Sequence, residues 1–180
     1  MSIVDRIKNI LFSPKTEWSA VKAESAGIQQ IYLQYLLVVA ALPAIGMLLD
    51  FRHRGLGTSL RMAVMGYLVT LASIYLSALI VDNLAPNFKS VRNLNNAFKL
   101  VAFAWTPSLV AMLLTFIPGL GTLLGLAGAI YSIYLFYLGL PVLMQTPQEK
   151  VVPYMIATFV VSLVVYIVLF GILGFFFSVF

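Results

Sequence analysis

The sequence of 180 residues contains no cysteine, a single histidine and few charged residues of either sign. Without cysteine the chain has no disulfides, thiolate metal sites or cysteine nucleophiles. Only 9% of the residues are charged and 62% are hydrophobic, whereas soluble domains average about 25% charged and roughly 45–50% apolar residues. This composition excludes a soluble enzyme, because a domain of this size could not bury so much apolar surface. It also excludes intrinsic disorder, which needs low hydrophobicity and high net charge.

The hydrophobic residues are concentrated in five long runs. About 20 apolar residues cross a bilayer core of roughly 30 Å. The runs therefore predict an all-α polytopic membrane protein with five transmembrane helices, preceded by a short amphipathic interfacial segment. We place that segment at residues 1–26 and the five-helix domain at residues 27–180. The predicted spans cover residues 31–49, 62–81, 100–117, 122–144 and 151–175.

The N-terminal segment has two helical patterns. Residues 2–12 repeat apolar side chains at helical spacing opposite polar ones, which is typical of a helix lying in the membrane interface. Ser13 and Pro14 then form an N-cap followed by a proline at the first helical position, which predicts a second short helix. We expect Trp18 on this helix to be an interfacial anchor at head-group depth. The alternative is a helix that binds a protein partner.

The basic residues predict the orientation of the chain. Eight of the eleven Lys and Arg residues fall on the N-terminal side of a five-span chain, and three fall on the other side. The eight are Arg6, Lys8, Lys15, Lys22, Lys89, Arg92, Lys99 and Lys150. Because cytoplasmic loops carry an excess of basic residues, the N-terminus is predicted to be cytoplasmic and the C-terminus external, or periplasmic.

The longest polar loop, residues 83–99, contains Lys89, Arg92 and Lys99. Spacings of three and seven would align these side chains on one helical face. Our hypothesis is that they contact lipid phosphate, so that membrane lipids are the partner of this loop. The alternative is an ordinary basic cytoplasmic loop with no dedicated site.

Ionisable residues are absent from the interior of the predicted spans. Such residues usually mark proton relays, ion pathways or catalytic groups in membranes. The serines and tyrosines that remain have no base beside them at membrane depth to activate them, so we expect no catalytic residue and no enzyme activity. The lone His53 is a poor metal ligand, so no metal and no cofactor is predicted. The basic residues are too scattered to indicate nucleic acid.

The first and third predicted spans each contain a proline, and the fourth contains a set of small residues. Pro43 and Pro107 each remove a backbone hydrogen bond and are predicted to kink their helices. Gly121, Gly125 and Ala129 recur every four residues on the fourth span, which allows a second helix to approach closely. We interpret these three as a packing seam within the bundle. The alternative is the contact surface of a homo-oligomer or of a protein partner.

The fourth span also carries Tyr131, Tyr134 and Tyr137. Tyrosines at this spacing usually form hydrogen bonds between helices, and the alternative is a polar path for a small solute.

Three stretches resemble a known family: FSPKTEW at 12–18, AFAWTPSL at 102–109, and GAIYSIYLFYLGLPVLMQTPQEKVVPY at 128–154. They are similar to the YIP-domain membrane proteins, named for eukaryotic relatives that interact with Rab/Ypt GTPases, and most similar to the bacterial inner-membrane branch. The resemblance covers nearly the whole chain. It implies five helices in a bacterial inner membrane, a cytoplasmic N-terminus and a role in membrane organisation. The family has no catalytic residues to carry over.

The sequence leaves two functions open. The first is a non-enzymatic protein that organises the membrane or binds partners through its helix faces and its interfacial N-terminus. The second is a passive channel, a small-solute carrier or a lipid-handling protein that works through the proline-containing spans and the tyrosines. An open polar path would favour the second function, and a bundle sealed by Phe and Leu would favour the first.

Overall fold

The computed structural model describes the backbone of residues 2–179 and the side chains of residues 2–52, 55–172 and 174–175. Across these residues the chain is helical, with turns and short loops and no β-strand. Five helices are long and apolar enough to cross a membrane. The predicted all-α fold with five candidate spans is therefore confirmed.

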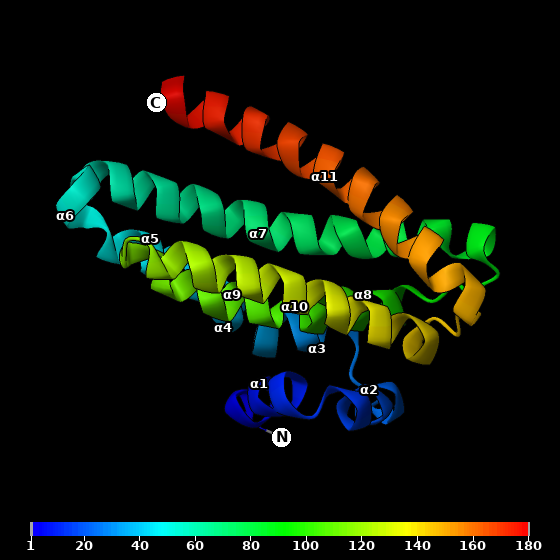
Figure 1. The fold of residues 1–180 in the computed structure, drawn as a ribbon. Coiled ribbons are helices and arrows are strands. Elements are labelled where there is room, and N and C mark those ends of the chain that lie inside the picture. The colour runs from blue at the N-terminus through cyan, green and yellow to red at the C-terminus, as the bar shows by residue number, and fades with distance from the viewer. Residues whose placement is uncertain (1, 180) are drawn as a thin grey trace.

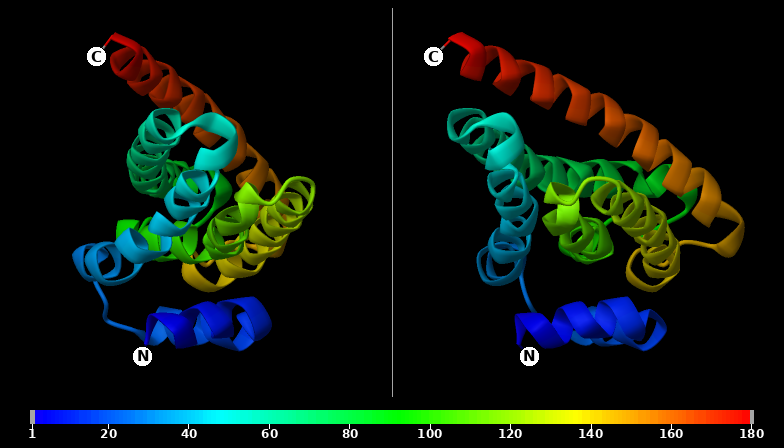
Figure 2. Two further views of the ribbon diagram at one scale, coloured as in Figure 1. Left: turned by 90° about the vertical axis from the view of Figure 1, so that its left-hand side faces the viewer. Right: turned by 60° about the vertical axis from the view of Figure 1, so that its left-hand side comes forward.

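Two short helices precede the spans. Helix α1 (Ile3–Phe12) begins at Ser2, whose hydroxyl accepts a hydrogen bond from the backbone N–H of Asp5 at 3.1 Å. Helix α2 (Pro14–Ala23) follows after one residue and has its proline in the first turn, where the missing N–H costs no intrahelical bond. We call α1 and α2 together the N-terminal hairpin. It lies along one side of the bundle (Figures 1 and 2).

The five spans are divided into the following helical elements. The first contains α3 (Ile28–Ile31), the π-helical turn η1 (Tyr32–Leu36), α4 (Leu37–Val39) and α5 (Ala41–Leu49). After the short α6 (Phe51–Arg54), the second contains α7 (Leu56–Leu84) and η2 (Ala85–Phe88). The third contains α8 (Leu94–Ala104), α9 (Thr106–Met112) and η3 (Leu113–Phe116). The fourth is α10 (Leu120–Leu143) and the fifth is α11 (Gln148–Val179).

The prolines produce helix breaks in two spans. The first span is interrupted at Ala40, and Pro43 lies in the first turn of the helix that follows. The third span is interrupted at Trp105, and Pro107 lies in the first turn of α9. The first N–H groups of a helix have no partner within it, so a proline there removes no intrahelical bond. Both predicted kink positions thus coincide with new helix starts.

The third span is the centre of the bundle and the fifth is its most peripheral member. In the third span 67% of the most apolar window is buried within the protein, against 6% in the fifth. Helix α11 runs diagonally across the face opposite the hairpin and diverges from α7 toward its C-terminal end (Figures 1 and 2). The hairpin and α11 therefore flank the central helices on opposite sides.

The second span is longer than predicted. Helix α7 has 29 residues, about 44 Å at ~1.5 Å per residue, and includes Arg61 and Asp82, which were expected to bound the span. A helix longer than the bilayer core tilts or extends into the head groups. Hydrophobicity predicted only the central, apolar part of this helix. The helical hydrogen bonding continues into the polar residues at both ends, which a hydrophobicity criterion does not detect.

Candidate functional site

The N-terminal hairpin is packed on the bundle through an apolar core of its own. Ile10, Trp18 and Val21 are all fully buried. The Trp18 ring fits against Gly139 of α10, where a Cβ atom would stand 3.0 Å from two of its ring carbons. Glycine at this position thus leaves room for the indole. The predicted interfacial anchor is wrong in this respect, because Trp18 packs inside the protein and reaches no lipid.

A buried charge cluster lies beneath the hairpin. Arg6 of α1 forms ion pairs with Glu17 of α2 and with Glu24, the residue that ends α2. Arg6 and Glu17 are 7% and 6% exposed. The Arg6 guanidinium also lies 5.1 Å above the ring centroid of Phe103 in α8, a cation–π geometry. One arginine therefore joins both helices of the hairpin to the third span.

The bundle also satisfies the C-terminal ends of both hairpin helices. Lys99, on α8, is 1% exposed, and its ammonium donates to the carbonyl oxygens of Val21, at 3.1 Å, and of Glu24. The Tyr131 hydroxyl, on α10, donates to the carbonyl oxygen of Leu11 at 2.7 Å. The last carbonyls of a helix have no partner within it and carry partial negative charge. A cation and a hydroxyl from the spans supply those partners here.

A pocket of about 460 Å³ opens between the hairpin and the first span. Its charged groups, Arg6 and Glu24, are paired with each other, and Gln30 and Gln34 are exposed on the adjoining helix. Beneath it the hydroxyl of Tyr35 forms a hydrogen bond with that of Thr106 at 2.7 Å.

The outer face of the hairpin is basic and partly apolar. Lys8, Lys15 and Lys22 are exposed, and Phe12 is 81% exposed. The one exposed acid of the hairpin, Asp5, accepts a hydrogen bond from the Ser2 hydroxyl at 2.6 Å, which lowers the pKa of its carboxyl. Because Glu17 and Glu24 turn inward to Arg6, the three lysines dominate the charge of the outer face.

A second polar cluster joins the loops at the end of the bundle where α7 and α10 end and α8 begins. Arg92 donates through Nε to Asp82 at 2.9 Å and through Nη2 to Asn83 at 2.8 Å. The backbone N–H of Val91 donates to the carbonyl of Met144 at 2.8 Å. These bonds fix the loop before α8 to α7 and to the end of α10.

The predicted basic face of Lys89, Arg92 and Lys99 is wrong. Lys89 lies in a left-handed turn after η2, with φ of 55°. Arg92 lies in the loop before α8 and is held by Asp82, while Lys99 is buried under the hairpin. The spacing argument assumed one continuous helix, whereas α8 begins only at Leu94. Of the three, Lys89 and Arg92 are exposed.

The face of α10 that packs against the bundle differs in part from the predicted packing seam. Gly121 is buried, but Ala129 is exposed, and a Cβ atom added at Gly125 would meet nothing within 4 Å. Close approaches occur at the predicted Gly121, where a Cβ atom would stand 2.5 Å from the Leu114 carbonyl oxygen, and at Gly128, which was not predicted. At Gly128 a Cβ atom would stand 2.8 Å from both the Ala111 Cβ and the Pro107 carbonyl oxygen. A repeat of four residues drifts around a helix of 3.6 residues per turn. An oligomer contact through the outward-facing Gly125 and Ala129 stays a prediction.

The three tyrosines of α10 do not line an internal path. Tyr131 is bonded to the hairpin, while Tyr134 and Tyr137 are 42% and 38% exposed on the outside of the bundle. Steps of three residues rotate by about 60° each around an α-helix. The buried face of α10 carries Ser132 and Phe136 instead.

Sequence reasoning missed Arg6, Glu17 and Glu24 as a cluster. In the sequence, these three charged residues occupy positions that are expected on the polar side of an interfacial helix. The sequence did contain one indication that Arg6 is buried, because Arg6 lies next to Ile7 and near Ile10 on the apolar side of its helix. The side chain of His53 lies outside the described residues. Among the side chains that are described, no group of three His, Asp or Glu residues could hold a metal ion.

The Yip1 domain family model matches residues 8–176, which include α2, all five spans and part of α1. The chain belongs to the Yip1 domain family. The chain is also 25% identical, over 170 residues, to the inner membrane protein YohC of Escherichia coli K12, covering 86% of this chain and 87% of that protein. The inner membrane protein YohC of E. coli O6:H1 matches to the same extent. No solved structure matches.

This family membership confirms the resemblance inferred from the sequence. The relatives are inner membrane proteins by name, and this Yip1 domain chain has five apolar helices of membrane-spanning length. It is thus an integral membrane protein of the same kind. The family match reaches into α1, so most of the hairpin belongs to the region that defines the domain.

Proposed function

We propose that this Yip1 domain chain is a non-enzymatic inner-membrane protein that gathers anionic lipid at the cytoplasmic surface through its docked N-terminal hairpin. The observation that carries the proposal is the division of charge in the hairpin. Glu17 is buried against Arg6 and Glu24 is paired with Arg6, whereas Lys8, Lys15 and Lys22 are exposed. A basic face beside an exposed apolar residue such as Phe12 suits an anionic membrane surface.

The orientation is part of this proposal. Because lysine side chains cannot lie in hydrocarbon at acceptable cost, the proposal places the outer face of the hairpin, which lies along one side of the bundle (Figure 1), at head-group level. The excess of Lys and Arg on the N-terminal side supports a cytoplasmic hairpin and a periplasmic C-terminus. The anionic lipids of the cytoplasmic leaflet are then within reach of the lysines.

The buried hydroxyls support a non-enzymatic role. Ser108 and Ser132 are bonded to each other at 2.9 Å, and Tyr35 is bonded to Thr106. A serine nucleophile needs an adjacent general base, and a second hydroxyl does not act as one. These hydroxyls join helices to one another, as polar side chains in membrane bundles commonly do.

The packing of the core favours membrane organisation over a passive channel or carrier. Large apolar side chains of the third and fourth spans fill the interior of the protein, each at most 3% exposed: Phe98, Leu100, Phe103, Leu135, Phe136 and Leu140. A conducting path would need polar or open space there.

The proposal is tested by replacing Lys8, Lys15 and Lys22 together with glutamine. A single cysteine at exposed Ser19 gives a unique labelling site, because the chain has no other thiol. In proteoliposomes of phosphatidylglycerol and phosphatidylcholine, energy transfer from the label to fluorescent phosphatidylglycerol reports local enrichment. We expect enrichment in the wild type and its loss in the triple variant, since each lysine near an anionic surface contributes about 1 kcal/mol.

The matched control replaces exposed Arg52 and Arg61, at the other end of the bundle, with glutamine. This control should leave the enrichment near the hairpin unchanged. Equal enrichment in the wild type and the lysine variant would contradict the proposal.

A further inference from the structure

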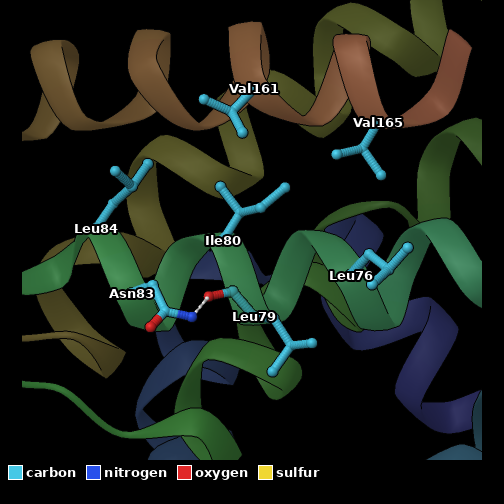
Figure 3. Close-up of a pocket in the computed structure, with 7 residues that line it drawn as sticks. All are labelled: Leu76, Leu79, Ile80, Asn83, Leu84, Val161 and Val165. Carbon is cyan, nitrogen blue, oxygen red and sulfur yellow. Dashed lines mark hydrogen bonds between the residues drawn. The ribbon is translucent and has the colours of Figure 1, made fainter. Parts of the chain in front are cut away.

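A groove lies between α7 and α11 on the side of the bundle away from the hairpin. Tyr154 of α11 donates to the carbonyl of Val81 in α7, and the two helices separate beyond that point (Figure 1). The groove measures about 260 Å³. Its aliphatic lining consists of Leu76, Leu79, Ile80, Leu84, Val161 and Val165. Val161 and Val165 point from α11 toward Ile80 and Leu76 (Figure 3).

One residue of this lining is polar and connects the groove to a cation. The side-chain amide of Asn83 donates to the carbonyl of Leu79 at 2.8 Å, and its oxygen accepts from Arg92 Nη2 at 2.8 Å. Arg92 is also held by Asp82, yet its side chain is 60% exposed. The loop that carries Arg92 also carries exposed Lys89. The groove therefore has an apolar length and a basic end.

We propose that this groove binds one acyl chain of an anionic phospholipid whose phosphate is bound by Arg92. A guanidinium has five N–H donors, and only those of Nε and Nη2 are shown in bonds to Asp82 and Asn83. The remaining donors match phosphate geometry, which arginine binds in a bidentate manner. Asp82 and Asn83 hold the guanidinium in place before the lipid arrives, so little further ordering is needed on binding.

The apolar length and the basic end match the two parts of one lipid. An acyl chain in the groove covers aliphatic side chains from two helices at once, whereas lipid elsewhere on α11 meets a single convex helix. Asn83 lies next to Leu84 at one end of the groove and bonds to Arg92, so the proposal places the head group at that end. A lipid that surrounds the protein without a specific site would make no defined contact with the Asn83 amide or the Arg92 guanidinium.

The test is native mass spectrometry of the protein released into mild detergent with equal phosphatidylglycerol and phosphatidylcholine. We expect one retained phosphatidylglycerol per wild-type chain. Val161→Phe fills the groove and should reduce retention about tenfold. The matched control is Val164→Phe, on an exposed position of α11 that does not line the groove, and it should retain the lipid.

The head-group contact is tested separately with Arg92→Gln. Losing a charge-assisted hydrogen bond should reduce the preference for phosphatidylglycerol over phosphatidylcholine about tenfold. The matched control is Arg61→Gln, an exposed arginine near the N-terminal end of α7, and it should leave this preference unchanged. The Val161→Phe result stands even where Arg92→Gln disturbs the loop, because the two substitutions lie on different elements.

Three outcomes overturn the inference. The first is wild-type retention by Val161→Phe. The second is equal loss of lipid from Val161→Phe and Val164→Phe, which indicates annular binding. The third is a lipid-free dimer that Val161→Phe converts to a monomer, which indicates a second copy of the chain in the groove.

Discussion

Replacing Arg6 with methionine is expected to detach the N-terminal hairpin from the five-helix bundle. Arg6 is the cation that pairs with the buried carboxylate of Glu17, and its guanidinium also holds Glu24 and covers Phe103. Methionine keeps much of the apolar stem but leaves the Glu17 charge buried. Breaking a buried ion pair in this way costs about 3–5 kcal/mol, a large fraction of the free energy that holds the hairpin.

Limited trypsin digestion in detergent measures this release. Lys15 and Lys22 are exposed but sit in docked helices, so cleavage there requires local opening. We expect fast cleavage at both sites in Arg6→Met and slow cleavage in the wild type.

Two further variants separate charge from packing. Lys8→Met removes an exposed cation from the same helix and should leave cleavage at Lys15 and Lys22 slow. Arg6→Met combined with Glu17→Gln removes both charges and should restore part of the protection, because no uncompensated charge remains. If Arg6→Met and Lys8→Met are cleaved equally slowly, the buried cluster does not hold the hairpin.

Trp18→Ala is expected to lower the thermal stability of the protein more than any single exposed substitution in the hairpin. Trp18 is fully buried between the hairpin and Gly139 and Leu100 of the spans. Truncating a buried tryptophan costs about 3–5 kcal/mol, because apolar contacts are lost and a cavity remains. The unfolding temperature in detergent, followed by circular dichroism, should fall clearly.

The control for this prediction is Phe12→Ala. Phe12 is also a large aromatic residue of the hairpin, but it is 81% exposed, and surface substitutions usually change stability by less than about 0.5 kcal/mol. Equal unfolding temperatures for the two variants would show that Trp18 is not packed as described.

The number of spans could be predicted from the sequence because the bilayer fixes how long an apolar run must be. The prolines were equally informative, since a missing N–H restricts where a helix can continue. Pro43 and Pro107 accordingly lie at the starts of new helical segments.

The hairpin site could not be predicted because its contacts join distant parts of the chain. The ammonium of Lys99 and the carbonyl of Val21 are separated by 78 residues, and no local pattern encodes that pairing. In isolation Lys99 is a basic residue at the start of a span, which the positive-inside rule assigns to a loop. Burial by the hairpin changes it into a cap for the end of α2.

Which face of α10 packs against the bundle could not be predicted for a different reason. This helix is apolar on all sides, so hydrophobicity does not distinguish the face toward the bundle from the face toward lipid. Small residues occur on both: Gly128 meets α9, while Gly125 faces open space. In membranes the buried face is selected by shape, which a single sequence does not reveal.

The measurement that most directly tests the docked hairpin is quenching of Trp18 fluorescence in proteoliposomes. The chain has two tryptophans, so Trp105→Phe leaves Trp18 as the single emitter. A Phe12→Trp variant that lacks both native tryptophans provides an exposed reference. We predict that neither aqueous acrylamide nor brominated phospholipid quenches Trp18 appreciably, while the reference is quenched strongly. Quenching of Trp18 by brominated lipid to the level of the reference would place it among the head groups and contradict the docked hairpin.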